Sequence, residues 1–122
     1  MTNRAASLRL QQLIEALTAL AADAEAQTAW LRRYAVPTDE LALNFDDAFW
    51  AVGPLPAKAL AGCRTIDATL NGMSGPGSSR RWEPAALAGD AGWALVRRVA
   101  REVLDGLERE GVARMPEIEV IR

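Results

Sequence analysis

The sequence predicts an all-α fold, a single-domain antiparallel helical bundle of about four main helices plus one short helix. Apolar residues recur at steps of three and four over several long stretches, which is the period of an amphipathic helix. Proline and glycine separate those stretches from one another. A chain of 122 residues is long enough to bury one core. We therefore expect residues 1–111 to form the bundle and residues 112–122 to form a C-terminal extended tail.

The clearest predicted helix is Asp90–Gly111, which every other element would help to cover. The carboxylate of Asp90 can cap its first turn, and Gly111 can close its last turn with a positive φ. Its apolar seam is formed by Trp93, Val96, Ala100, Val103 and Leu107.

The chain before Pro37 predicts one long amphipathic helix, from Arg4 to Tyr34, because its leucines and alanines keep the helical spacing throughout. The next helix is predicted to begin after an N-cap at Thr38. Residues 41–45 also alternate as a strand would, so this stretch is open between helix and strand. We favour the helix, because a lone strand would leave its backbone groups without partners.

The remaining elements are marked by prolines and glycines. A third helix is predicted from residue 56 to residue 71 or 72. Serines and glycines at 74–79 predict a flexible surface loop, and a short helix is predicted at 84–88. The tail at 112–122 alternates as an extended segment does, and the sequence leaves open whether it is ordered.

Composition argues against several classes of function. A net charge of −2 gives no field that would attract nucleic acid or an anionic membrane. No secretory signal or membrane-spanning run is present, so we expect a cytoplasmic protein. The bias toward arginine and alanine is typical of GC-rich bacterial genomes. The chain has no histidine, and Cys63 lies on a helix seam as a core thiol does. We therefore expect no metal site and no cofactor, and the sequence leans against an enzyme.

A loop rich in glycine and serine is the candidate site for a small anionic ligand. Its glycines have the spacing of a phosphate-binding P-loop, but a serine replaces the lysine and a helix replaces the preceding strand. The arginines that follow can still hold an anion near a helix N-terminus. The weak ligand-binding candidates are Ser78, Ser79, Arg80, Arg81 and Trp82.

Acidic residues and aromatic residues that lie off the helix seams are the candidate interaction surface. Tryptophan and tyrosine are enriched at protein interfaces because they offer rigid apolar area with a polar handle. The alternative interpretation is that bulky residues fill the ends of a small bundle. The interaction candidates are Trp30, Tyr34, Asp39, Glu40, Asp46, Asp47 and Trp50.

A third and weaker hypothesis is an enzyme that uses Mg²⁺. Asp46, Asp47 and Asp67 are the carboxylates that helix starts do not explain, and paired carboxylates can bind Mg²⁺ or share acid and base roles. Their spacing does not match an EF-hand loop.

Arginines on the last helix give a weak hypothesis of DNA binding by a helix-turn-helix. The first turn of that helix carries Asp90, which would repel phosphate. Arg98 and Arg101 have acidic residues one turn later, Glu102 and Asp105, and we expect ion pairs between them.

The leading hypothesis is a small cytosolic protein-interaction module without catalytic activity, either a homodimer or a neutralising partner of another protein. The alternative is a binder of a small anionic ligand at the Gly72–Trp82 loop. The sequence supplies neither the identity of the partner or ligand nor the oligomeric state.

Overall fold

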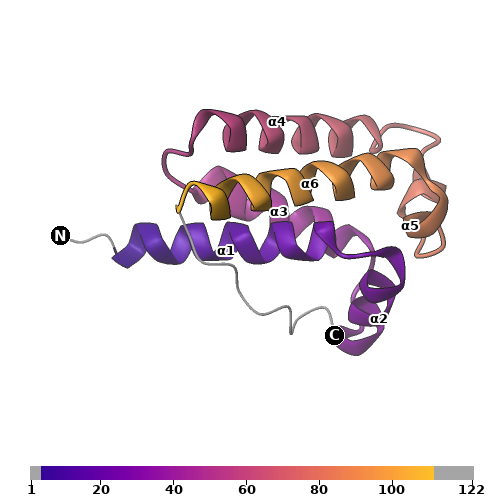
Figure 1. Cartoon of the computed structure of the whole chain (residues 1–122). Helices are drawn as coiled ribbons and strands as arrows, with labels where there is room; N and C mark the ends of the chain where they lie inside the picture. The colour runs from indigo at the N-terminus through magenta and orange to yellow at the C-terminus, as the bar shows by residue number, and fades with distance from the viewer. Residues whose placement is uncertain (1–3, 112–122) are drawn as a thin grey trace.

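Four antiparallel helices form the body of the computed structural model, which describes residues 4–111 (Figure 1). These four are α1 (Arg4–Ala21), α3 (Asp39–Ala51), α4 (Ala57–Gly72) and α6 (Ala91–Arg109). The smaller elements are α2 (Ala24–Tyr34), the 3₁₀ turn η1 (Ser79–Trp82) and α5 (Ala86–Gly89). The long helix α6 lies between α4 and α1, while α3 packs mainly on α1. No strand occurs within residues 4–111, so the predicted all-α bundle is confirmed.

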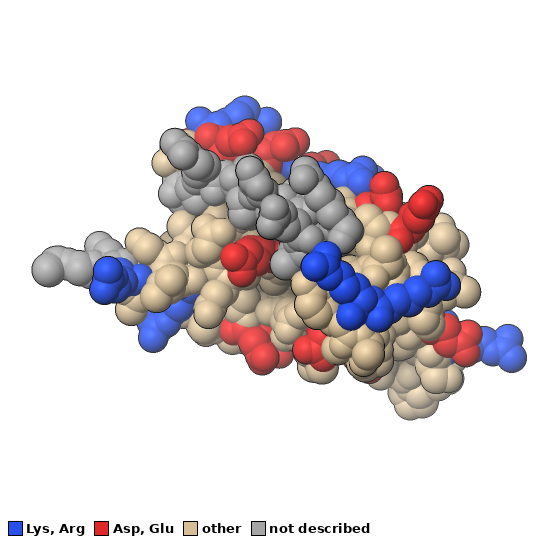
Figure 2. Space-filling view, turned by 90° about the horizontal axis from the view of Figure 1, so that it is seen from below, with Lys and Arg blue, Asp and Glu red and all other residues tan. Residues whose placement is uncertain are grey.

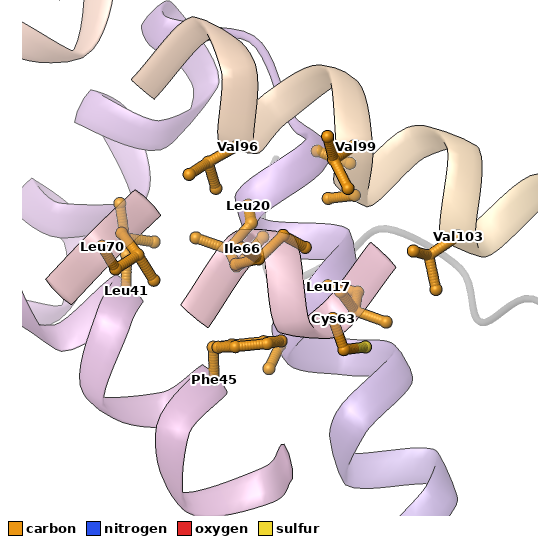
Figure 3. Close-up of a cluster of buried hydrophobic side chains, with 14 of the residues drawn as sticks. Leu17, Leu20, Leu41, Phe45, Cys63, Ile66, Leu70, Val96, Val99 and Val103 are labelled. Atoms are coloured by element: carbon orange, nitrogen blue, oxygen red, sulfur yellow. The ribbon is translucent and has the colours of Figure 1, made fainter. Parts of the chain in front are cut away.

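The core lies where the apolar seams of the four long helices meet. In Figure 3, Leu20 of α1 lies close to Ile66 of α4, and Leu17 of α1 lies close to Cys63 of α4. Val96 of α6 belongs to the same buried cluster. Phe45 of α3 is completely buried in the same cluster. This position settles the stretch 41–45 as helix, because a helical turn is what brings its apolar residues to the core.

The spacing predicted one helix over Arg4–Tyr34, but this stretch forms two helices. α1 ends at Ala21, and Asp23 starts α2 by accepting a hydrogen bond of 2.9 Å from the backbone N–H of Ala26. An aspartate in this role stabilises a helix start by about 1 kcal/mol. The apolar spacing continues across the break, which is why periodicity alone predicted a single helix.

Side chains from α2 and α6 donate hydrogen bonds to the backbone carbonyl groups at the end of α1, which have no partners within the helix. The last four carbonyls of any helix lack partners within it. Here the carbonyl oxygens of residues 19–22 accept, in order, from Gln27 (3.0 and 3.1 Å), Arg101 (2.7 Å) and Arg97 (3.0 Å). The prediction that Arg101 pairs with Asp105 is therefore wrong. Its guanidinium binds the α1 carbonyl, because α1 packs beside α6.

Arg97 joins three segments at this corner. Besides the carbonyl of Ala22, it donates to the side-chain oxygen of Gln27 at 3.1 Å and to the carbonyl of Leu87 at 2.9 Å. Burial, and then the charge of Arg101, lower the pKa of Arg97. Gln27 is itself only 1% exposed, so α6 holds the α1–α2 corner through a buried polar contact.

The predicted ends of α6 are confirmed, whereas the predicted cap of α3 is not. Asp90 accepts a hydrogen bond of 2.7 Å from the backbone N–H of Gly92, and Gly111 has a φ of +68°. α3 begins after Thr38, but the threonine side chain makes no capping bond. Its backbone is in the α region, whereas a capping side chain needs an extended backbone.

The other boundaries differ from prediction by a few residues. α4 ends at Gly72 as expected, the short helix forms at Ala86–Gly89, and the arginines after the loop form η1. The predicted tail at 112–122 lies outside the described residues. Within the described range, no helix has both the length and the apolar character needed to cross a lipid bilayer.

Candidate functional site

A cleft of about 350 Å³ lies where α1, α2 and α3 meet, and we call it the α1–α3 cleft. Its floor consists of Ala16, Ala19 and Ala48, each 7% exposed. Their short side chains leave room between two helices that are otherwise in contact. The polar residues that line the cleft are Gln12, Glu15, Asn44 and Asp47, and Trp30 of α2 completes the lining.

Trp30 differs from the other three tryptophans in its hydrogen bonding. Its indole N–H is buried and has no hydrogen-bond partner among the described residues. The indole groups of Trp50, Trp82 and Trp93 donate at 2.9, 2.8 and 2.7 Å. A buried donor without an acceptor costs about 1–3 kcal/mol, so the Trp30 N–H is a feature that requires an explanation. The ring packs at a tilt against Tyr34, with 5.5 Å between the ring centroids.

The charge of the α1–α3 cleft is negative. Glu15 comes from α1 and Asp47 from α3, and no lysine or arginine is among the lining residues. Figure 2, which views the molecule from below, shows both acidic and basic side chains on this face, with acidic ones in its middle and along its lower edge. The cleft is therefore suited to a cation and unsuited to an anion.

The outer side of α3 exposes apolar residues next to acidic ones. Leu43 is 53% exposed and Trp50 is 71% exposed. With Asp46 and Asp47 they occupy neighbouring turns of one helix side, and we call these four residues the α3 face. The indole N–H of Trp50 donates to the carboxylate of Asp46 at 2.9 Å. Two predicted interaction residues are thus paired, and Asp47 belongs to both the α3 face and the α1–α3 cleft.

The three carboxylates considered for Mg²⁺ do not converge on one point. Asp46 and Asp67 line a smaller pocket of about 160 Å³ between α3 and α4, whereas Asp47 lines the α1–α3 cleft. Adjacent residues on a helix point about 100° apart, which is why Asp46 and Asp47 separate. Across residues 4–111, no group of three or more His, Cys, Asp or Glu side chains is arranged to hold a metal ion.

The arginines of the Gly72–Trp82 loop are only partly available to an anion. Arg81 donates to both carboxylate oxygens of Asp90, at 2.8 and 3.0 Å. The hydrogen bond from Arg81 lowers the pKa of Asp90, and the bond from the backbone N–H of Gly92 acts in the same direction. A carboxylate therefore already fills the guanidinium fork that a phosphate would need. Arg80 and Ser79 are exposed, and Ser78 is half-buried.

Trp82 and Trp93 give the same loop a structural role. Trp82 donates to the carbonyl of Met73 at 2.8 Å, and its ring meets the ring of Trp93 edge to face at 5.3 Å. Trp93 is 1% exposed and donates to the carbonyl of Arg81 at 2.7 Å. Trp93 is buried, as its place on the apolar seam predicted, and the two indoles fix the path of the loop.

Cys63 lies in the core, as its place on the helix seam predicted. It is fully buried in the packed side chains of Figure 3, and burial raises its pKa to about 12. A thiol with that pKa stays protonated at neutral pH and is a poor nucleophile.

The predicted interaction residues do not form one surface. Trp30 and Asp47 both line the α1–α3 cleft, whereas Tyr34 is half-exposed on α2. Asp39 and Glu40 lie in the first turn of α3 and complement the helix dipole. The polar lining of the cleft was missed, because the sequence predicts an amphipathic helix around Gln12 and Glu15 but not which helix faces these residues. The lining residues that had not been considered are Gln12, Glu15 and Asn44.

Comparisons with protein-family models, with curated proteins and with solved structures find no match to this chain.

Proposed function

We propose that this protein is a cytoplasmic protein-interaction module without catalytic activity, and that the α3 face is its contact surface. The observation that carries the proposal is the 71% exposure of Trp50. Tryptophan is the residue type most enriched among the side chains that dominate binding energy at interfaces. Leu43, two turns earlier on the same side of the helix, extends the exposed apolar area.

The hydrogen bond between Trp50 and Asp46 favours binding. It restrains an exposed side chain in one orientation, so less conformational entropy is lost when a partner covers the ring. Contact with Phe49, with 5.5 Å between the ring centroids, supports the same orientation. Removing a central tryptophan from such a surface typically costs about 2 kcal/mol or more of binding free energy.

The acidic residues of the α3 face would select the partner rather than supply most of the affinity. Exposed carboxylates at the edge of an interface change the association rate and exclude like-charged proteins. Asp46 and Asp47 therefore favour a partner with basic residues around an apolar patch. Either a second protein or a second copy of this chain, which carries 14 lysines and arginines, meets that requirement.

The alternative, a small anionic ligand at the Gly72–Trp82 loop, has weaker support. The ion pair between Arg81 and Asp90 leaves Arg80 as the more exposed cation of the pair of arginines. A shift of the melting temperature in rising concentrations of inorganic phosphate would support this alternative.

Two measurements on the same variants test the proposal. The wild type and the Leu43→Ser/Trp50→Ser double variant are compared by light scattering and by affinity capture from a cell extract, with Arg98→Ser as the surface control. We expect the wild type and the control to dimerise or retain the same protein, and the double variant to lose that association. A monomeric wild type that captures nothing, or capture that survives in the double variant, would refute the proposal.

A further inference from the structure

We propose that the α1–α3 cleft receives an arginine side chain from a basic segment of the partner protein. This inference rests on the proposed function, because it names the chemistry by which that partner is recognised. Asp47 connects the two, since it belongs both to the α3 face and to the lining of the cleft. A partner that covers the α3 face would therefore extend past the mouth of the cleft.

Charge supports a cationic occupant. The two ionisable side chains that line the cleft are Glu15 and Asp47, which come from different helices. A guanidinium between them can donate to a carboxylate on each side, because its N–H donors are arranged in a planar fork. Gln12 and Asn44 add neutral side-chain oxygens to the same rim.

Trp30 supports arginine in particular. Its ring lines the cleft, and a guanidinium stacks on an indole more readily than an ammonium does. Its buried N–H has no acceptor among the described residues. That atom is shielded from solvent, so its signal in magnetic resonance reports repacking of the ring when the cleft is filled.

The size and floor of the cleft agree with one long side chain. Its volume of about 350 Å³ is at the lower end of ligand-sized pockets. The three alanines of the floor provide an apolar surface for the methylene groups of an arginine, while its charged end lies among the carboxylates.

Nuclear magnetic resonance of the purified full chain tests this inference without a known partner. Each of the four tryptophans contributes one indole N–H signal, and Trp30→Phe assigns the signal in question. The probe is the peptide acetyl-Gly-Arg-Gly-amide, and the control is the same peptide with neutral citrulline in place of arginine. We expect the arginine peptide to shift the Trp30 signal while the other indole signals stay in place.

Matched variants then locate the binding. Glu15→Gln and Asp47→Asn are each expected to weaken the binding of the arginine peptide by about three-fold, which is the range expected for the loss of an exposed ion pair. Glu108→Gln removes a carboxylate that is also exposed, on α6 and outside the cleft lining, and is expected to leave the affinity unchanged.

Three results would overturn the inference. They are an equal response to the citrulline peptide, a Trp30 signal that does not move, and an affinity that Glu15→Gln leaves unchanged. A Trp30 signal that shifts as the protein alone is concentrated would instead place a second copy in the cleft and exclude a foreign arginine. If capture still depends on Trp50 while any of these results is found, the cleft inference fails and the proposed function stands.

Discussion

Replacement of Arg97 by methionine should destabilise the fold more than any neighbouring surface change. Methionine keeps the apolar stem and the helix propensity but removes the three hydrogen bonds that join α6 to the end of α1, to Gln27 and to α5. A hydrogen bond from a charged donor contributes about 1.5–3 kcal/mol net. The three bonds share one side chain, and water can reach part of the freed carbonyls. We therefore expect a loss of about 3 kcal/mol in the free energy of unfolding.

Urea titration followed by circular dichroism at helical wavelengths measures this loss. Arg98→Met is the matched control, because Arg98 is the next residue on α6 and is exposed. The control should change the free energy of unfolding by no more than about 0.5 kcal/mol. If Arg97→Met lowers the free energy of unfolding by less than about 1 kcal/mol, or by no more than the control does, the hydrogen bonds of Arg97 do not hold the α1–α2 corner against α6.

Three further outcomes follow from the packing. Gly62→Ala should lower the free energy of unfolding by about 1–2 kcal/mol, because the added methyl group would collide with a valine of α6. Gly106→Ala, whose added methyl group meets open space, should raise it by up to about 1 kcal/mol in the same urea titration. The pKa of Asp90 is lowered chiefly by the hydrogen bond from Arg81, so the contribution of Asp90 to stability is present above about pH 4 and is lost as the pH falls through the lowered pKa. Asp90→Asn should therefore make the free energy of unfolding depend less on pH below about pH 4. Cys63 should resist iodoacetamide at about pH 8 while the protein is folded, by mass spectrometry, and react once it is unfolded.

Each of these outcomes has a clear contrary result. A Gly62→Ala variant as stable as the wild type would show that α4 and α6 are not in close contact at that point. If Asp90→Asn leaves the pH dependence of the unfolding free energy in acid unchanged, the ion pair does not contribute to the stability of the fold. Equal alkylation of Cys63 in the folded and unfolded protein would place the thiol outside the core.

The elements that the sequence predicted best are those that local signals define. The capping aspartate and the closing glycine bound α6 correctly, because a cap depends on residues within one turn of it. The helix at 41–45 was also favoured correctly over a strand, because a lone strand would have left its backbone groups without partners. The break after Ala21 was missed, although Asp23 is a capping residue, because the apolar pattern runs through it.

The contacts that the sequence could not predict join residues far apart in the chain. Arg97 and Arg101 bind carbonyls at the end of α1, 75 and 80 residues earlier. Helical spacing suggested Asp105 as the partner of Arg101, but nothing local reveals which helix lies alongside. The α1–α3 cleft was missed for the same reason: the alanines of its floor indicate a cleft only when α1 and α3 are known to be neighbours. The signal that was present is two alanines on α1 and one on α3, with polar residues on the same side of each helix.

A photo-crosslinking amino acid placed at position 50 tests the central claim most directly. The probe replaces Trp50 in living cells, and position 98 on α6, which is also exposed, serves as the control site. If the α3 face is the contact surface, irradiation at position 50 yields one discrete larger product, either a dimer or an adduct with one partner, and position 98 yields none. No product at position 50, or the same products at both positions, would contradict the claim that this protein works by binding another through α3.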